Sequence, residues 1–141
     1  MAEIELQGMQ ELLDQLTALG RRGARIENKA LLAAAKPILD EAVMNAPIRT
    51  GGGAAGLAIS RVKTKGDEKH VLIGIEKADM SEIFYMKFIE FGSSPHRIIR
   101  NGVGRDHPGT NAEPFLGPAY EYKKGEAISI LKEEFRKGLG L

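Results

Sequence analysis

The sequence predicts a single α+β domain in which two long helices pack against a small antiparallel sheet. Near both ends of the chain, apolar residues recur at three- and four-residue steps, which is typical of amphipathic helices. In the middle they alternate with polar residues, which is typical of strands. The chain has 141 residues, the length of one ordinary domain, and its sequence shows no internal repeat and no second domain within 1–141.

Composition excludes several classes of function. The chain has no cysteine, which removes disulfides, thiolate metal sites and thiol catalysis. Its 20 basic and 19 acidic side chains give a formal net charge of +1, without the basic excess of proteins that hold nucleic acid by its phosphates. We expect a soluble protein with no signal peptide and no membrane contact, because no apolar run approaches the roughly 20 residues that a spanning helix requires.

The first third of the chain predicts one strand and two helices. Residues 2–7 alternate charged and apolar side chains and predict a short, half-exposed strand. An apolar stripe over 9–19 predicts a first helix, and the glycines and arginines at 20–23 predict its end. A second helix is predicted over about 24–45, with an alanine-rich apolar face and a kink at Pro37.

The rest of the chain predicts a hairpin, a short helix, a long loop and a last helix. Residues 57–64 and 70–76 predict two antiparallel strands joined by a glycine-containing turn. Residues 80–91 fit a short helix better than a strand. Residues 93–113 lose any period and predict a long flexible loop, a kind of segment that usually carries function. A last helix over 118–138 completes the order β-α-α-β-β-(α)-loop-α.

No arrangement of residues in the sequence predicts an active site or a metal site. His70, His96 and His107 lie in different segments without the spacing of zinc ligands, and surface or loop positions explain them better. Glu90 has no second carboxylate or nucleophile near it in sequence, so a structural role as a hydrogen-bond acceptor is favoured over acid–base catalysis. The glycines at 51–53 follow a helix and precede a strand, the wrong order for a phosphate-binding loop. We expect no catalytic residue, no metal and no cofactor.

A basic cluster lies in the predicted loop and is the candidate site for contact with a partner. Its members are His96, Arg97, Arg100, Arg105 and His107, opposed by the single acid Asp106. Three explanations stay open: contact with the acidic surface of a partner protein, which is favoured, a solvated loop, and contact with DNA phosphates. Contact with DNA ranks last because the cluster has no aromatic side chain on which bases could stack.

Four short motifs resemble one protein family. Residues 46–60 resemble an element "aP..TG.L..SI", residues 85–92 an element "Y...vEfGT", residues 113–119 an element "rPFL.pA", and residues 4–9 the start "i.G..el". This order and spacing resemble those of the tail-completion proteins of long, non-contractile-tailed phages and prophages, a family of head–tail joining and tail-terminator components. The motif positions, which we interpret as core and turn residues, are Pro47, Thr50, Gly51, Leu57, Tyr85, Glu90, Phe91, Gly92, Pro114, Phe115 and Ala119. Ser93 stands where the family has threonine.

The resemblance implies a structural virion protein without enzymatic activity. It implies a subunit of a ring, a hexamer, that completes or terminates the tail tube and joins it to the head connector. The implied partners are other copies of the chain, the head connector or stopper protein, and the tail tube protein, with DNA passing through the ring only as cargo. The implied location is the tail or neck of the virion, after assembly in the host cytoplasm.

Two other classes of protein are the alternatives. A DNA-binding or packaging accessory protein would use the basic cluster at 96–107 and would show salt-dependent retention on DNA. An enzyme would need a convergent polar pocket, and the sequence offers no constellation of residues for one.

Overall fold

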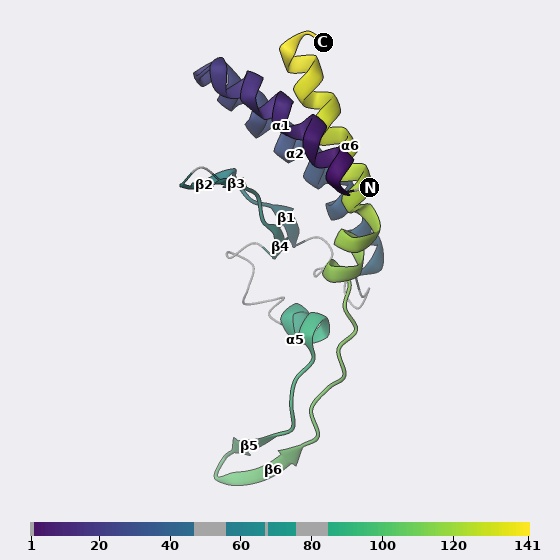
Figure 1. Cartoon of the computed structure of the whole chain (residues 1–141). Helices are drawn as coiled ribbons and strands as arrows, with labels where there is room; N and C mark the ends of the chain where they lie inside the picture. Colours follow the sequence, from purple (N-terminus) through teal and green to yellow (C-terminus); the bar gives the residue numbers. More distant parts are fainter. Residues whose placement is uncertain (1, 47–55, 67, 76–84) are drawn as a thin grey trace.

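The computed structural model describes residues 2–46, 56–66, 68–75 and 85–141 and has an α+β fold, as predicted (Figure 1). The elements are α1 Ala2–Ala18, α2 Arg21–Asn45, β1 Leu57–Ile59, β2 Lys63–Lys65, β3 Glu68–His70, β4 Ile73–Ile75, α5 Tyr85–Phe91, β5 His96–Arg100, β6 Val103–His107 and α6 Leu116–Leu139. This order departs from the predicted one at the start of the chain and within residues 93–113.

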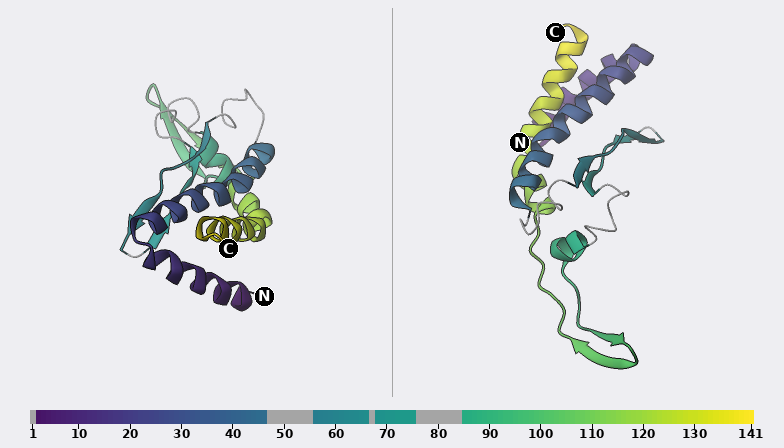
Figure 2. Two further views of the ribbon diagram at one scale, coloured as in Figure 1. Left: turned by 90° about the horizontal axis from the view of Figure 1, so that it is seen from above. Right: turned by 180° about the vertical axis from the view of Figure 1, so that it is seen from behind.

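Three helices form the main layer of the molecule. The long helices α2 and α6 pack along each other, and α1 lies against both (Figure 2). The alanine-rich face predicted for α2 is buried at Ala30, Ala34 and Ala42, where small side chains allow α6 to approach closely. Pro37 lies inside α2, and the helix continues beyond it to Asn45.

Residues 2–7 form the beginning of α1, so the prediction of a strand there is wrong. Glutamate, leucine, glutamine and alanine make up most of this stretch and have high helix propensity, so the segment extends the helix that the stripe from Met9 specifies. Alternation over only six residues could not outweigh that propensity. The stripe itself is confirmed, because Leu12 and Leu16 are buried together with Ala30 and Phe135.

The hairpin predicted from 57–64 and 70–76 is present, with an interruption in each strand. Leu57 pairs with Ile75 and Ile59 with Ile73, whereas beyond the interruption Lys63 pairs with His70. The β1–β2 side therefore holds one more residue than the β3–β4 side between these pairs, which is the arrangement of a β-bulge.

Ser60 bridges the interruption between the two ladders. Its backbone N–H donates to the carbonyl oxygen of Leu72 at 2.8 Å, and its hydroxyl accepts from the N–H of Leu72 at 2.8 Å. Beyond the bulge, the turn between β2 and β3 contains Gly66 at φ +62°, a backbone conformation that glycine adopts without strain. The second residue of that predicted turn, Asp67, lies outside the described residues.

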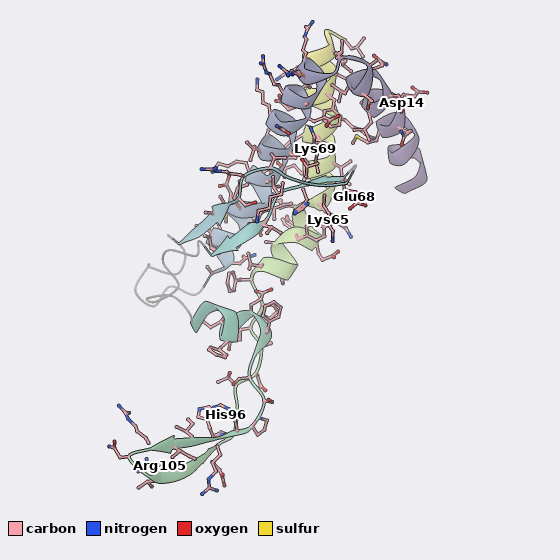
Figure 3. All side chains as sticks on the ribbon, turned by 90° about the vertical axis from the view of Figure 1, so that its left-hand side faces the viewer. Asp14, Lys65, Glu68, Lys69, His96 and Arg105 are labelled. Atoms are coloured by element: carbon pink, nitrogen blue, oxygen red, sulfur yellow. The ribbon has the colours of Figure 1, made fainter. Side chains whose placement is uncertain are left out.

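This hairpin packs against the helical layer. Leu57 joins a buried cluster with Ala42 of α2 and with Ala46, the residue that follows α2. Ile73 contacts the cluster formed by Ala34, Ile38 and Ala127. At the far end, the Nζ of Lys69 lies 2.8 Å from the carboxylate of Glu27 and holds the β2–β3 tip near α2 (Figure 3).

Residues 93–113 contain a second antiparallel hairpin, so the prediction of an irregular loop over this segment is wrong. Strands β5 and β6 project away from the helices at the end of two extended arms (Figure 1). The local reason is the Asn101-Gly102 pair, which has φ values of +52° and +76° and forms the kind of tight turn that suits a twisted hairpin. The β-branched Ile98, Ile99 and Val103 beside the turn favour strands.

No described helix is both long enough and apolar enough to cross a bilayer.

Gly23 allows the close approach of α1 and α2. It was predicted to belong to the break between the helices, but it lies inside α2, and a Cβ at this position would collide with the backbone carbonyl of Leu16. We expect Gly23→Ala to lower the free energy of unfolding by about 1–3 kcal/mol, because backbone must shift to make room. Thermal or urea denaturation would measure the loss.

Gly125 provides the matched control. It lies inside α6, and a Cβ there would meet nothing within 4 Å. Gly125→Ala should therefore stabilise the protein by up to about 1 kcal/mol through its better helix propensity. Equal effects of the two substitutions would contradict the close approach at Gly23.

Candidate functional site

The carboxylate of Glu90 caps the start of α6. Its Oε2 accepts hydrogen bonds from the N–H of Phe115 at 2.7 Å and of Leu116 at 2.9 Å, and its Oε1 accepts from the N–H of Gly117 at 2.9 Å. The residue that precedes the helix, Phe115, has no side chain that can cap it. Glu90, 25 residues away in sequence and 8% exposed, supplies the missing acceptor.

Glu90 is ionised in this arrangement. Burial raises the pKa of its carboxyl group, but the three backbone hydrogen bonds from Leu116, Phe115 and Gly117 together lower it by more. The resulting pKa lies below the ordinary value of 4.5. The positive end of the α6 dipole favours the same charged form. The structural role predicted for Glu90, that of a hydrogen-bond acceptor, is the one that the structure gives it.

Three of the four motif segments converge at this cap, whereas the segment at residues 4–9 lies on α1, where Met9 packs in another cluster. Leu57, Phe115 and Ala119 are buried in one cluster, and Ile89, the residue before Glu90, packs against it. Segments that stand far apart in the sequence therefore meet at one place. Pro47, Thr50 and Gly51, the other positions of the first motif, lie outside the described residues, as does the side chain of Tyr85.

Phe91 is a motif residue that does not belong to the core. It is 75% exposed, so its interpretation as a core residue is wrong, and Phe88 is also largely exposed. The cause is the short helix α5: Ile89 and Glu90 face the cluster and the cap, so positions 88 and 91 lie on the opposite side. Sequence spacing placed the two phenylalanines on one face, and that face is the outer one.

A narrow neck connects this scaffold to the β5–β6 hairpin. Ser93 and Thr110 exchange two backbone hydrogen bonds of 3.0 Å, and their hydroxyl oxygens lie 3.1 Å apart. Gly92, at φ +71°, is packed so closely that a Cβ would lie 2.7 Å from the carbonyl oxygen of Thr110. The N–H of Glu113 donates to the carbonyl oxygen of Ile89 at 2.8 Å and closes the scaffold side of the neck. Pro114, the remaining motif residue, follows directly and is exposed.

The hairpin brings the predicted basic cluster together. Register pairs His96 with His107, Ile98 with Arg105, and Arg100 with Val103, and side chains of these pairs share one face. The rings of the two histidines stack with centroids 4.8 Å apart. This set of six residues is called the basic face below.

The other face of the hairpin has little net charge. Arg97 pairs with Asp106 across the strands, and its guanidinium lies 3.6 Å from the carboxylate. Ile99 and Gly104 complete this face, and Ile99 is 73% exposed. Arg97 therefore differs from the two arginines of the basic face, which have no ion pair with a described residue.

The basic face is concave. A hollow of about 630 Å³ is lined by Ile98, Arg100, Asn101, Val103, Arg105, Asp106 and His107. Ile98 and Val103 expose much of their apolar side chains there, beside the charges of the arginines. A surface that combines exposed aliphatic groups with arginine is typical of protein interfaces. The arrangement offers contact with a partner.

The described part of the chain gives little support for a metal-binding site. Within it, no three side chains of histidine, aspartate or glutamate come close enough to hold a metal ion. His70 lies on β3, apart from the pair on the hairpin.

Comparison with known proteins identifies one family. A family model described as "Bacteriophage HK97-gp10, putative tail-component" matches residues 10–92, more than half of the chain. The match begins within α1 and ends at Gly92, directly after α5, where the neck begins. Searches of curated proteins and of solved structures gave no match.

Loss of the Glu90 charge should destabilise the scaffold. We expect Glu90→Gln to lower the free energy of unfolding at pH 7 by about 1–3 kcal/mol, because an amide offers one acceptor oxygen and turns N–H groups toward backbone donors. Denaturation by urea would measure the loss. Glu113→Gln, an exposed neighbour whose side chain makes no hydrogen bond with a described residue, is the control and should change little.

The loss should also depend on pH. Since folding lowers the pKa of Glu90, its charge stabilises the native state above the ordinary pKa, and this contribution disappears as the pH falls through the folded-state pKa. The difference between the wild type and Glu90→Gln should therefore shrink below about pH 4. A difference that stays constant down to pH 3 would show that the cap does not act through the carboxylate.

Proposed function

The chain belongs to the HK97-gp10-like family of bacteriophage tail components, and from this premise we propose that it is a ring-forming subunit at the head–tail junction. Its proposed work is to complete or terminate the tail tube and to join the tube to the head connector. The proposed ring is a hexamer located in the tail or neck of the virion and assembled in the host cytoplasm. Its proposed partners are other copies of the chain, the head connector or stopper protein, and the tail tube protein.

The projecting hairpin is the observation that supports this proposal. Strands β5 and β6 have extensive contacts only with each other among the described elements, and they extend away from the body (Figures 1 and 2). Ile99 and Val103 are 73% and 60% exposed on it. Exposed aliphatic side chains on an arm that makes no extensive contact with other described elements are best explained by burial against another subunit. Phe91, exposed at the base of the neck, is a separate apolar side chain that a partner could cover.

The proposed role is structural, without catalysis or cofactor. Contacts within a ring are heterologous, so two different surfaces of each subunit must be complementary. A projecting arm is suited to such contacts, because it reaches beyond the outline of its own subunit. The outer edges of β5 and β6, which no other described strand pairs with, add backbone groups that a neighbouring strand can bind. DNA is proposed to pass through the ring only as cargo.

A DNA-binding or packaging accessory protein is the second candidate. Arg100 and Arg105 favour it, since each lacks an ion pair with a described residue and could neutralise a phosphate. The exposed isoleucines and valine beside them favour a protein partner instead. Retention on DNA that falls steeply with salt concentration would favour the accessory role.

Electron microscopy of tails assembled without this protein tests the proposal directly. We expect tails that are overlong or are not joined to heads, because nothing would stop tube growth or form the joint. Restoring the protein should restore tails of uniform length attached to heads. Normal infectious particles in its absence would refute the proposed function.

Removing the three arginines of the hairpin should prevent assembly without unfolding the subunit. We expect Arg97→Ala, Arg100→Ala and Arg105→Ala together to abolish joining, while thermal stability changes by less than about 1 kcal/mol because all three are exposed. The control replaces three exposed basic residues of α2 by alanine, namely Arg21, Arg25 and Lys29, and so removes the same amount of charge. Normal assembly of the hairpin variant, or failure of both variants, would contradict a specific role of the arm.

A further inference from the structure

The helix α1 is acidic along its length. Its sequence contains four acidic residues and no lysine or arginine. Leu12 and Leu16 bury one side of the helix against α2 and α6. Glu11 and Asp14 lie on the other side, exposed and without an ion pair to any described residue. Asp14 accepts only a hydrogen bond from its own helix, from Gln10 at 2.9 Å.

The basic face of the hairpin is the electrostatic counterpart of this helix. Arg100 and Arg105 line its hollow, and neither has an acidic partner among the described residues. Within one chain the two surfaces cannot meet: Asp14 on α1 and Arg105 on β6 lie at opposite ends of the molecule (Figure 3). Each surface is therefore available to a different molecule, one at each end.

We infer that α1 of one subunit seats in the concave basic face of the β5–β6 hairpin of the next subunit. Glu11 and Asp14 would then meet Arg100 and Arg105, and the backbone of the outer side of α1 would lie over Ile98 and Val103. This inference rests on the proposed ring and deepens it, because it names the two complementary surfaces. The rounded side of a helix fits a hollow of about 630 Å³ better than a flat partner surface would fit it.

A second copy of the chain explains both surfaces at once. An unrelated acidic partner, or DNA, would account for the hairpin but would leave the acidic helix without a counterpart. Heterologous contacts between identical subunits use one surface of each kind per subunit, and repetition of the contact closes a ring when the rotation between neighbours allows it. Arginine suits the hairpin side, because its planar guanidinium can bind a carboxylate through two hydrogen bonds.

Disulfide cross-linking tests the contact, since the natural chain has no cysteine that would interfere. The variant Gln15→Cys with Val103→Cys places one thiol on the exposed side of α1 and one on the basic face. Oxidation of the full-length protein should give a ladder of covalent oligomers that ends in a closed ring. The control variant Gln15→Cys with Lys124→Cys, which moves the second thiol to exposed α6, should give no ladder.

The absence of a ladder at the highest soluble concentration would overturn the inference. Equal ladders from the two cysteine pairs would overturn it as well, because random collision would then explain both. If wild-type rings stand at the ends of tails in electron micrographs while the Gln15/Val103 pair gives no ladder, the inference fails and the proposed function survives. If tails are normal without the protein, the proposed function itself fails.

Charge reversal tests whether the charges make the contact. In the cysteine-containing chain, Arg100→Glu with Arg105→Glu should abolish the ladder, and so should Glu11→Lys with Asp14→Lys. Mixing the two reversed proteins should restore it, because the acidic hairpin then meets the basic helix while the two natural surfaces meet each other. Reversal of Glu121 and Glu133, two exposed acids of α6, to lysine is the matched control and should leave the ladder intact.

Failure of the mixture to restore cross-linking would overturn the inference, even if each reversal abolishes it. Circular dichroism of each variant would identify any that does not fold. Restored cross-linking in the mixture would also show that both variants are folded, because only folded surfaces can form the contact. Loss of DNA retention with an unchanged ladder would assign the arginines to DNA instead.

Discussion

The hydrogen bonds between the Glu90 carboxylate and the first N–H groups of α6 join the two halves of the structure. A helix that starts beside a buried cluster leaves donors without partners, and an unpaired buried N–H costs about 1–3 kcal/mol. Phe115 precedes α6 and fills the cluster, so the same position cannot also supply a cap. Glu90, which lies on α5, accepts these hydrogen bonds instead. Its charge is retained although burial opposes it, because three donors and the helix dipole act on the carboxylate together.

The cap also separates the hairpin from the core. Glu90 and the hydrogen bond from Glu113 to Ile89 hold the two arms at the scaffold, and the Ser93–Thr110 pair holds them again further out. Gly92 permits this second closure, since any side chain there would collide with the opposite arm. The hairpin beyond the neck makes no extensive contact with the helices. Substitutions on its faces should therefore affect binding to a partner more than the stability of the fold. For this reason, surface variants of the hairpin can report on assembly.

Sequence patterns predicted the parts of the fold that depend on local periodicity or on a motif. The stripe of α1, the alanine face of α2 and the structural role of Glu90 all follow from such signals. The prediction of an N-terminal strand failed because alternation over six residues is a weaker signal than the helix propensity of the same residues. The prediction of an irregular loop at 93–113 failed for the opposite reason. Asn101-Gly102 is a strong local turn signal, but the prolines and glycines around it obscured that signal. No sequence pattern could show that Phe91 faces outward, because that depends on which side of α5 the cluster occupies.

The near-neutral composition of the chain conceals two local surfaces of opposite charge. A net charge of +1 argues against binding of nucleic acid by the molecule as a whole, and it says nothing about how the charges are arranged. Here α1 contains acidic residues and no basic one, whereas Arg100 and Arg105 of the β5–β6 hairpin have no ion pair with a described residue. Asp14 of α1 and Arg105 of the hairpin lie far apart (Figure 3). The proposed contact between α1 of one subunit and the hairpin of the next would bring these two surfaces together. A near-neutral composition that weakens the case for DNA binding is therefore compatible with the association between subunits that we propose for this tail component.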